Sequence, residues 1–293
     1  MGLFEWYKGI SAAAFGGLAR SSVSSFSSLK PHLMGAGIKV LLETWIAMIY
    51  FATALAYAAS LAALLALSLF VPFDFMTFMY MMVFGPVMAA SLVFALLYIY
   101  PVQKSMSIRN SIDNNLPFAL AHMNAIASSG IPPEFMFELL TGFKEYGHVS
   151  KQAGLVVRNI KTFGMSSVNA IAEVAKRTPS PAFKQILAGI QSTIEKGGNL
   201  TEYLGQMSER SLFEYRLKRE NYAKTLSTYA DFYTAVLISA PIMMIVVLGV
   251  MSVIGGDIMG MAATDLIFLM TWLIIPMVNI VFIAFLHITY PGM

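Results

Sequence analysis

The chain has 293 residues, of which 57% are hydrophobic and only 12% are charged. An average soluble domain is about half apolar and about a quarter charged, so this composition excludes a disordered chain and argues against a fully soluble protein. The sequence contains no cysteine. That excludes disulfides, thiolate metal sites and a cysteine nucleophile.

Residues 1–37 mix apolar and polar side chains and lack the continuous apolar core of a cleaved signal peptide. The stretch from Phe4 to Arg20 permits two interpretations. It can form an amphipathic helix on the inner face of a membrane, with Trp6 and Tyr7 at the depth of the lipid headgroups. It can equally be a loosely ordered leader, and the sequence favours neither.

Four later stretches are long and apolar enough to span a membrane, because each has at least 22 residues and no Asp, Glu, Lys or Arg. The predicted spans are residues 46–70, 79–100, 233–254 and 266–288. Prolines lie inside three of them, at Pro86, Pro241 and Pro276. In membrane helices such prolines usually produce kinks, because neighbouring groups can satisfy the freed carbonyls.

The charges indicate how the spans are oriented. Residues 102–228 carry 15 of the 19 Lys and Arg residues, whereas the connections between paired spans carry only acids, at Asp74, Asp257 and Asp265. Basic segments stay in the cytoplasm, so we expect a multi-pass protein of the cell (cytoplasmic or inner) membrane with both termini cytoplasmic. The predicted fold is all-α. Its predicted parts are an N-terminal cytoplasmic segment (1–37), a transmembrane hairpin (38–101), a cytoplasmic helical bundle (102–228) and a second transmembrane hairpin (229–293).

Glycines, prolines and capping residues divide the predicted bundle into about six helices. The first follows Asn114 and Asn115, has Pro117 in its first turn and stops at Gly130. Later helices run from 132 to 147, 149 to 164 and 166 to 178, from Ser180 to Gly198, and from about 200 without a stop signal into the third span. The predicted core residues are Leu116, Phe118, Leu120, Met123, Ile126, Phe135, Leu139, Leu140, Ile186, Ile190 and Ile194.

No catalytic constellation is recognisable in the sequence. It has no GxxxxGK[ST], HExxH or GxSxG motif, and its four histidines are widely spaced. We therefore expect no enzymatic activity, no cofactor and no metal. Asn279 is the one amide deep in a predicted span, and a helix–helix hydrogen bond explains it better than a substrate ligand does.

Basic residues of the bundle form two groups. Arg216, Lys218 and Arg219 precede the third span and suit solvent or anionic lipid, while Asp231 lies at the predicted membrane boundary. These four residues are also the candidates for coupling the bundle to the membrane. A group farther from the membrane in sequence makes a protein partner plausible, and it comprises Lys176, Arg177, Lys184 and Lys196. Nucleic acid is not expected, because the bases are interleaved with acids and the net charge of residues 102–228 is only +5.

Several segments resemble the type II secretion system F domain family, and most closely its archaeal branch. They are LPFALAHMNAIASSGIPP, AIAEVAKRTPSPAFKQILAGIQSTIEKGGNLTEYL and EYRLKRENYAKTLSTYADFYTAVLISAPI. This branch includes the membrane platform proteins of archaeal type IV pili and the archaellum, with Tad-type platforms as more distant relatives. The positions that carry the family pattern are Pro117, Gly130, Thr178, Pro179, Ser180, Pro181, Gly197, Gly198 and Glu202.

The resemblance implies a non-enzymatic platform in the lipid bilayer that couples a hexameric cytoplasmic ATPase to type IV pilin-like subunits. It implies ATPase docking at Lys176, Arg177, Lys184 and Lys196. Archaellum platforms commonly carry two copies of the soluble-domain-plus-spans unit, and this sequence has one, so a homo-oligomer or a pair with a paralogue is expected. The alternative is a small transporter or channel with a cytoplasmic regulatory bundle, which the uncharged spans disfavour.

Overall fold

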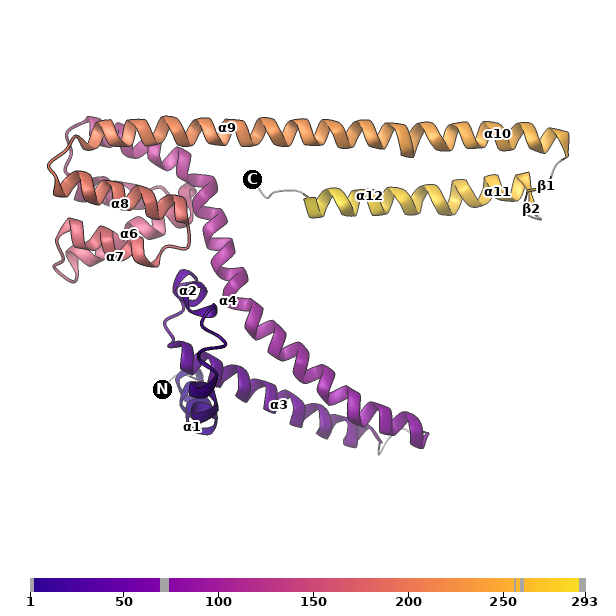
Figure 1. Cartoon of the computed structure of the whole chain (residues 1–293), viewed down its shortest axis with the longest axis horizontal. Coiled ribbons are helices and arrows are strands. Elements are labelled where there is room, and N and C mark those ends of the chain that lie inside the picture. The colour runs from indigo at the N-terminus through magenta and orange to yellow at the C-terminus, as the bar shows by residue number, and fades with distance from the viewer. Residues whose placement is uncertain (1–2, 69–73, 256, 259–260, 290–293) are drawn as a thin grey trace. The chain divides into compact units, whose positions relative to one another are not determined.

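The computed structural model describes residues 3–68, 74–255, 257–258 and 261–289. Its contacts divide the chain into two compact units, Met1–Ser211 and Leu212–Met293. The described residues are almost entirely helical (Figure 1). Four helices are long and apolar enough to cross a membrane, and they begin at Leu42, Phe75, Leu200 and Ala263.

The first unit opens with α1 (Leu3–Ser22), which is a helix and not a loose leader. In Figure 1 it is seen along its axis while α3 (Leu42–Ser68) runs across the view, so the two helices cross steeply. Tyr7 fixes the crossing, because its hydroxyl donates to the carbonyl of Met48 at 2.9 Å and its ring meets Phe51 edge-on.

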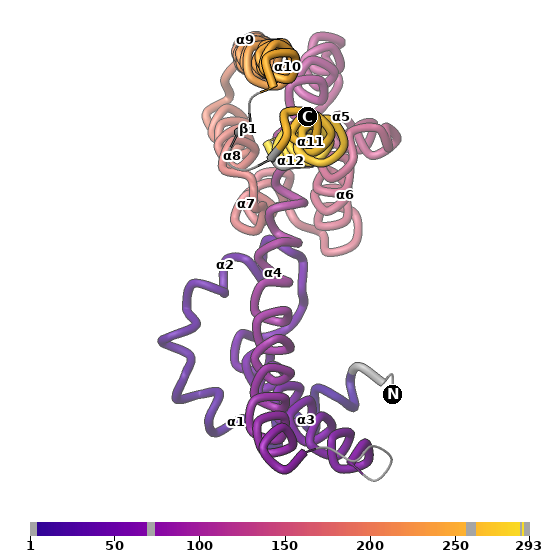
Figure 2. Tube along the Cα trace, turned by 90° about the vertical axis from the view of Figure 1, so that its right-hand side faces the viewer, coloured from indigo at the N-terminus to yellow at the C-terminus, as the bar shows by residue number. Residues whose placement is uncertain are grey.

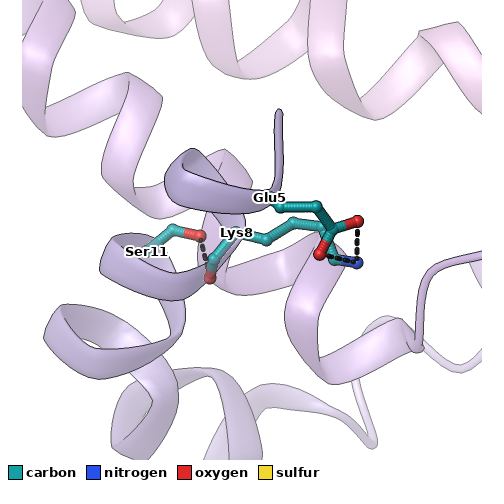
Figure 3. A network of polar contacts seen from close by, with 3 residues as sticks. All are labelled: Glu5, Lys8 and Ser11. Atoms are coloured by element: carbon teal, nitrogen blue, oxygen red, sulfur yellow. Dashed lines mark hydrogen bonds and ion pairs between the residues drawn. The ribbon is translucent and has the colours of Figure 1, made fainter. Parts of the chain in front are cut away.

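Local pairing satisfies the polar groups at the start of α1 (Figure 3). The ammonium of Lys8 donates to both carboxylate oxygens of Glu5, at 3.1 and 3.3 Å. The fully buried Ser11 donates its hydroxyl to the backbone carbonyl of Lys8 at 3.1 Å. The bond made by Ser11 lowers the cost of burying its hydroxyl, whereas the Lys8–Glu5 pair lies at the surface.

α4 (Phe75–Ser128) is one helix of 54 residues that lies antiparallel to α3 along its first half (Figures 1 and 2). Trp45 stacks on Tyr100 with ring centroids 6.4 Å apart. Farther along, the side chain of Leu64 lies 3.1 Å from the position that a Cβ would take at Gly85. The small residue therefore allows close approach of the two helices near their far end.

The prediction that a new helix begins after Asn114 and Asn115 is wrong. α4 continues through Pro101 and Pro117, both of which are buried. An internal proline costs about 3 kcal/mol, and tertiary packing on both halves of α4 outweighs that cost. Asn115 does not cap a new helix, because its side-chain amide donates back to the carbonyl of Ser111 at 2.7 Å within the same helix.

The remaining bundle helices follow most of the predicted punctuation, but the prediction of one helix over residues 132–147 is wrong. α5 ends at Thr141, and residues 144–146 form a separate 3₁₀-helix. The N-cap serines, Ser166 and Ser180, accept hydrogen bonds from the backbone at 3.3 and 3.0 Å. Gly130, Gly147 and Gly164 all have positive φ where a helix ends or the next begins. The elements are α2 (Leu29–Gly35), α5 (Pro133–Thr141), the 3₁₀-helix η1 (Lys144–Tyr146), α6 (His148–Lys161), α7 (Ser167–Arg177), α8 (Pro181–Glu195) and α9 (Leu200–Tyr233).

Most predicted core residues are buried between α4 and the helices packed on it. Those in the core cluster are Leu116, Leu120, Met123, Ile126, Leu140, Ile186 and Ile190, with Ile194 partly buried against it. Three predictions are wrong, because Phe118, Phe135 and Leu139 are 43%, 53% and 45% exposed. Phe135 and Leu139 are four residues apart and share the outer face of α5, whereas Met136 and Leu140 on its other face are fully buried.

In the second unit α9 continues through a π-helix, η2 (Thr234–Ser239), into α10 (Ala240–Ile254). A short antiparallel pair, β1 (Asp257–Ile258) and β2 (Met261–Ala262), leads to α11 (Ala263–Leu269), the π-helix η3 (Met270–Ile274) and α12 (Ile275–Thr289). Each π-helix directly precedes a predicted kink, at Pro241 and Pro276. A proline cannot donate to the carbonyl four residues earlier, so the turn before it widens to bonds between residues five apart.

Candidate functional site

The segment Thr178–Pro181 joins α7 to α8 and is anchored to α4 by Ser180. Ser180 is fully buried, and its hydroxyl donates to the carboxylate of Asp113. The same oxygen accepts the backbone N–H of Phe183 at 3.0 Å and so caps α8. Asp113 in turn lies 3.4 Å from the guanidinium of Arg109. The predicted family-motif residues here therefore hold α7 and α8 in place on α4.

Three of the four predicted docking residues lie at this connection, and we call them the basic corner: Lys176, Arg177 and Lys184. Lys176 and Arg177 form the last turn of α7, and Lys184 lies in the first turn of α8. All three are exposed. Arg177 is bound to Glu173 at 2.6 Å. They are therefore exposed cations at the adjoining ends of two consecutive helices.

Lys196 lies elsewhere. It follows the last residue of α8, about 18 Å along the helix axis from Lys184 at about 1.5 Å per residue. There it borders a shallow groove of about 370 Å³ between α8 and α9. Gly197 has φ +65° at the end of α8, and Asn199 caps α9 by accepting the N–H of Glu202 at 3.1 Å. The structure therefore splits the predicted docking group.

Tyr203 joins α9 to α8, a contact that no sequence pattern predicted. Its hydroxyl donates to the carbonyl of Ile186 at 3.3 Å, and its ring lies against Gly189. A Cβ at Gly189 would fall 1.9 Å from the Tyr203 hydroxyl, so glycine is needed for the close approach. Burial raises the pKa of the Tyr203 phenol above its ordinary value.

The second predicted basic group lies along the exposed surface of α9. Arg216, Lys218 and Arg219 are all exposed, and so is Asp231 near the end of that helix. The guanidinium of Arg219 lies over the ring of Tyr215 at 5.9 Å. This arrangement fits either solvent or anionic lipid, and a role for these residues in coupling stays a prediction.

Asn279 forms the helix–helix hydrogen bond that the sequence favoured. Its side-chain oxygen accepts the hydroxyl proton of Tyr233 at 2.8 Å, while its nitrogen donates to the carbonyl of Ile275 at 2.8 Å. The two bonds leave one amide proton and one acceptor position for other partners. A neighbouring groove of about 320 Å³ is lined mainly by apolar and aromatic side chains such as Phe282 and Leu286.

The histidines of the bundle make structural contacts. The Nδ1 of His122 lies 3.1 Å from the hydroxyl of Tyr146, and the Nδ1 of His148 lies 3.1 Å from the hydroxyl of Ser111. Across the described ranges, no three His, Cys, Asp or Glu side chains lie close enough together to hold a metal ion.

Comparison with known proteins places these features in a family. Residues 119–248 match the family model of the type II secretion system (T2SS) protein F. The matched range begins within α4, contains all of α5 to α9 and ends within α10. It therefore includes the basic corner, the Ser180 anchor and most of the third apolar stretch. No solved structure matches the chain.

Two uncharacterized proteins of Methanocaldococcus jannaschii are also similar to the chain. One, MJ1286, is 23% identical over 192 residues, which cover 64% of this chain and 32% of that protein. The other, MJ0780, is 25% identical over 132 residues, which cover 45% of this chain and 39% of that protein. The chain thus spans about a third of the length of these relatives. The four apolar helices and this match indicate a multi-pass membrane protein in which residues 119–248 correspond to a type II secretion system protein F domain.

Proposed function

We propose that this chain is the membrane platform of a type IV pilus-like assembly or secretion machine. The observation that carries the proposal is the match of residues 119–248 to the type II secretion system protein F family, whose members are generally non-catalytic platform proteins. The matched range joins a helical bundle to an apolar helix long enough to enter a membrane. Such a chain can transmit a movement without any chemistry of its own.

In this proposal a hexameric cytoplasmic ATPase docks on the basic corner, and pilin-like subunits contact the platform in the membrane. Lys176, Arg177 and Lys184 are exposed on adjacent helix ends, and Ser180 anchors those ends to α4. A force applied there reaches α4 through a buried hydrogen bond. It also reaches α9, because Tyr203 fixes α9 to α8. α9 then continues without a break into η2 and α10.

The proposal is tested by purifying the full chain in a neutral detergent with a secretion ATPase from the same organism. We expect a complex that weakens as salt rises, because exposed charges are screened at high ionic strength. Reversing Lys176, Arg177 and Lys184 to Glu should abolish it. The matched control reverses Lys144, an exposed cation of η1 outside the basic corner, and should leave the complex intact.

Failure to form a complex under any salt condition, with the protein folded, would contradict ATPase docking by this chain alone. It would favour a platform that needs a paralogue, or a transporter. Loss of the complex in the Lys144→Glu control as well would show that total charge, and not the basic corner, governs binding.

A further inference from the structure

A cavity of about 560 Å³ lies within the first unit, between the segment that follows α2 and the helices α4, α6 and α7. We call it the polar cavity. Its volume is in the range of small-molecule sites, about 300–1,000 Å³. Its polar lining comprises Lys39, His148, Gln152, Arg158, Asn159 and Arg177, together with Glu173.

Close packing of the N-terminal segment forms one wall of the polar cavity. Gly35 lies so near α4 and the α7–α8 connection that a Cβ there would fall 2.7 Å from the hydroxyl of Ser105 and 2.9 Å from the Cβ of Pro179. Gly37 turns the chain with φ +67°. The wall is therefore a fixed part of the fold, which is what a preformed site requires.

The polar cavity has a surplus of positive charge. Arg177 is already paired with Glu173. Lys39 and Arg158 form no ion pair with any residue that the structure describes. The guanidinium of Arg158 lies over the ring of Phe163 at 5.8 Å, which restricts its freedom without using its hydrogen-bond donors. Two cationic groups are thus available to an anion.

Two amide side chains of the lining also lack partners. Asn159 is only 7% exposed, yet its side chain makes no hydrogen bond within the described part of the chain. The side-chain oxygen of Gln152 is fully buried and likewise has no partner there. Leaving a buried polar group unpaired costs about 1–3 kcal/mol, and native proteins satisfy nearly all such groups. At Asn159, whose polar atoms are not closed off from the cavity, a bound molecule that offers an acceptor and a donor would supply the missing partners.

We propose that the polar cavity binds a phosphate ester that carries at least one hydroxyl group. The phosphate would accept hydrogen bonds from Arg158 and Lys39, because guanidinium and ammonium groups are the usual protein partners of phosphate. The amide of Asn159 can donate to the same oxygens. The ligand hydroxyl would donate to the side-chain oxygen of Asn159, which also lines the cavity.

Apolar side chains complete the lining and suit the carbon skeleton of such an ester. Ile38, Ile108 and Leu155 contribute this surface. The same chemistry occurs in the headgroup of an anionic phospholipid and in a soluble phosphate monoester. The cavity lining indicates a phosphate ester, and binding measurements with a lipid and with a soluble ester distinguish these two sources.

The test uses the full chain in a neutral detergent and native mass spectrometry to count bound ligands. The soluble probe is glycerol phosphate, and the lipid probe is phosphatidylglycerol, with phosphatidylcholine as the uncharged-headgroup comparison. We expect one saturable site for at least one of the two anionic probes and a weaker response to phosphatidylcholine. Binding of phosphatidylglycerol alone assigns a lipid headgroup, and binding of glycerol phosphate alone assigns a soluble ligand.

The variant that tests the site is Arg158→Gln combined with Lys39→Gln, since both side chains are exposed at the cavity and can be changed without opening the core. Binding should weaken by about tenfold or more, the usual effect of losing hydrogen bonds to a charged group. The matched control is Lys144→Gln, which removes an exposed cation outside the cavity and should leave binding unchanged. Equal binding by the double variant and the wild-type chain, or no saturable binding of either probe, would overturn the proposal.

Discussion

The hydroxyl of Ser180 connects two helices that are far apart in sequence, because it caps α8 and also donates to Asp113 on α4. The two residues are separated by 67 positions. Asp113 has only 27% of its side chain exposed, so the hydrogen bond is well shielded from water. The α7–α8 connection therefore depends on one buried side chain for both its local and its tertiary order.

Replacing Ser180 with Ala should lower the stability of the bundle by about 2 kcal/mol, since it removes an N-cap and leaves the Asp113 carboxylate short of a donor. The matched control is Ser166→Ala, which removes an exposed N-cap with no second partner in the described chain and should cost about 1 kcal/mol or less. Denaturant unfolding of the detergent-solubilised protein measures both. Equal losses in the two variants would show that the bond to Asp113 adds nothing.

Gly189 and Tyr203 provide a second test of packing. Ala at position 189 would place its Cβ 1.9 Å from the Tyr203 hydroxyl, so the ring must move and α9 must separate from α8. We expect a loss of about 1–3 kcal/mol, as for other overpacked sites. Gly205→Ala is the control, because its Cβ would meet Asn124 at an ordinary 3.6 Å. That variant should be neutral or gain up to about 1 kcal/mol from helix propensity, and a similar loss at both positions would contradict the packing argument.

The hydrogen bond between Tyr233 and Asn279 should stabilise the second unit modestly. A double-mutant cycle with Tyr233→Phe and Asn279→Leu is expected to give a coupling of about 0.6–1.7 kcal/mol, the range for such bonds between membrane helices. Unfolding in mixed detergent micelles provides the measurement. Tyr229→Phe is the control, because the ring of Tyr229 contacts Phe285 edge-on while its hydroxyl has no partner within the described residues. A coupling near zero would leave Asn279 without a structural role.

His148 should make the stability of the bundle depend on pH. Burial, followed by the charge of Lys151, lowers the pKa of His148 below its ordinary value of 6.5. Between pH 6.5 and the lowered pKa, His148 binds a proton in the unfolded chain but not in the folded chain. The free energy of unfolding therefore falls as the pH falls through this range. Thermal unfolding between about pH 8 and about pH 5 should show this decline. In His148→Gln the part of the decline due to this group should vanish, and an unchanged pH profile would show that other groups cause it.

The continuity of α9 with α10 predicts a mechanical role. Changing Tyr222 and Ala223 to glycine adds flexibility at a cost of about 1 kcal/mol per glycine within the helix. If the chain is the proposed platform, filament assembly or secretion should fail in this variant while the chain still folds and still binds the ATPase. The control is Tyr222→Ala alone, which removes the same side chain but keeps a strong helix former. Normal assembly in the double-glycine variant would exclude a rigid helix as the coupling element.

The amino-acid sequence alone determined the parts of this protein that depend on local chemistry. Uninterrupted apolar stretches predicted the four long apolar helices, because a span needs about 20 residues without charge. The caps at Ser166, Ser180 and Asn199 and the stop at Gly130 were predictable, because they involve residues only a few positions apart. The missing stop after Leu200 correctly predicted that α9 continues into the third apolar stretch. The motif residues also predicted the family.

Tertiary structure alone decided how these helices meet. Pro117 looked like a helix start, but packing along both halves of α4 outweighs its local cost. Phe118, Phe135 and Leu139 looked like core residues, although hydrophobicity by itself does not say which face of a helix is covered. The bond from Ser180 to Asp113, the contact of Tyr203 with Gly189 and the polar cavity all join residues distant in sequence. No local pattern encodes them, since each depends on which helices the hydrophobic core brings together.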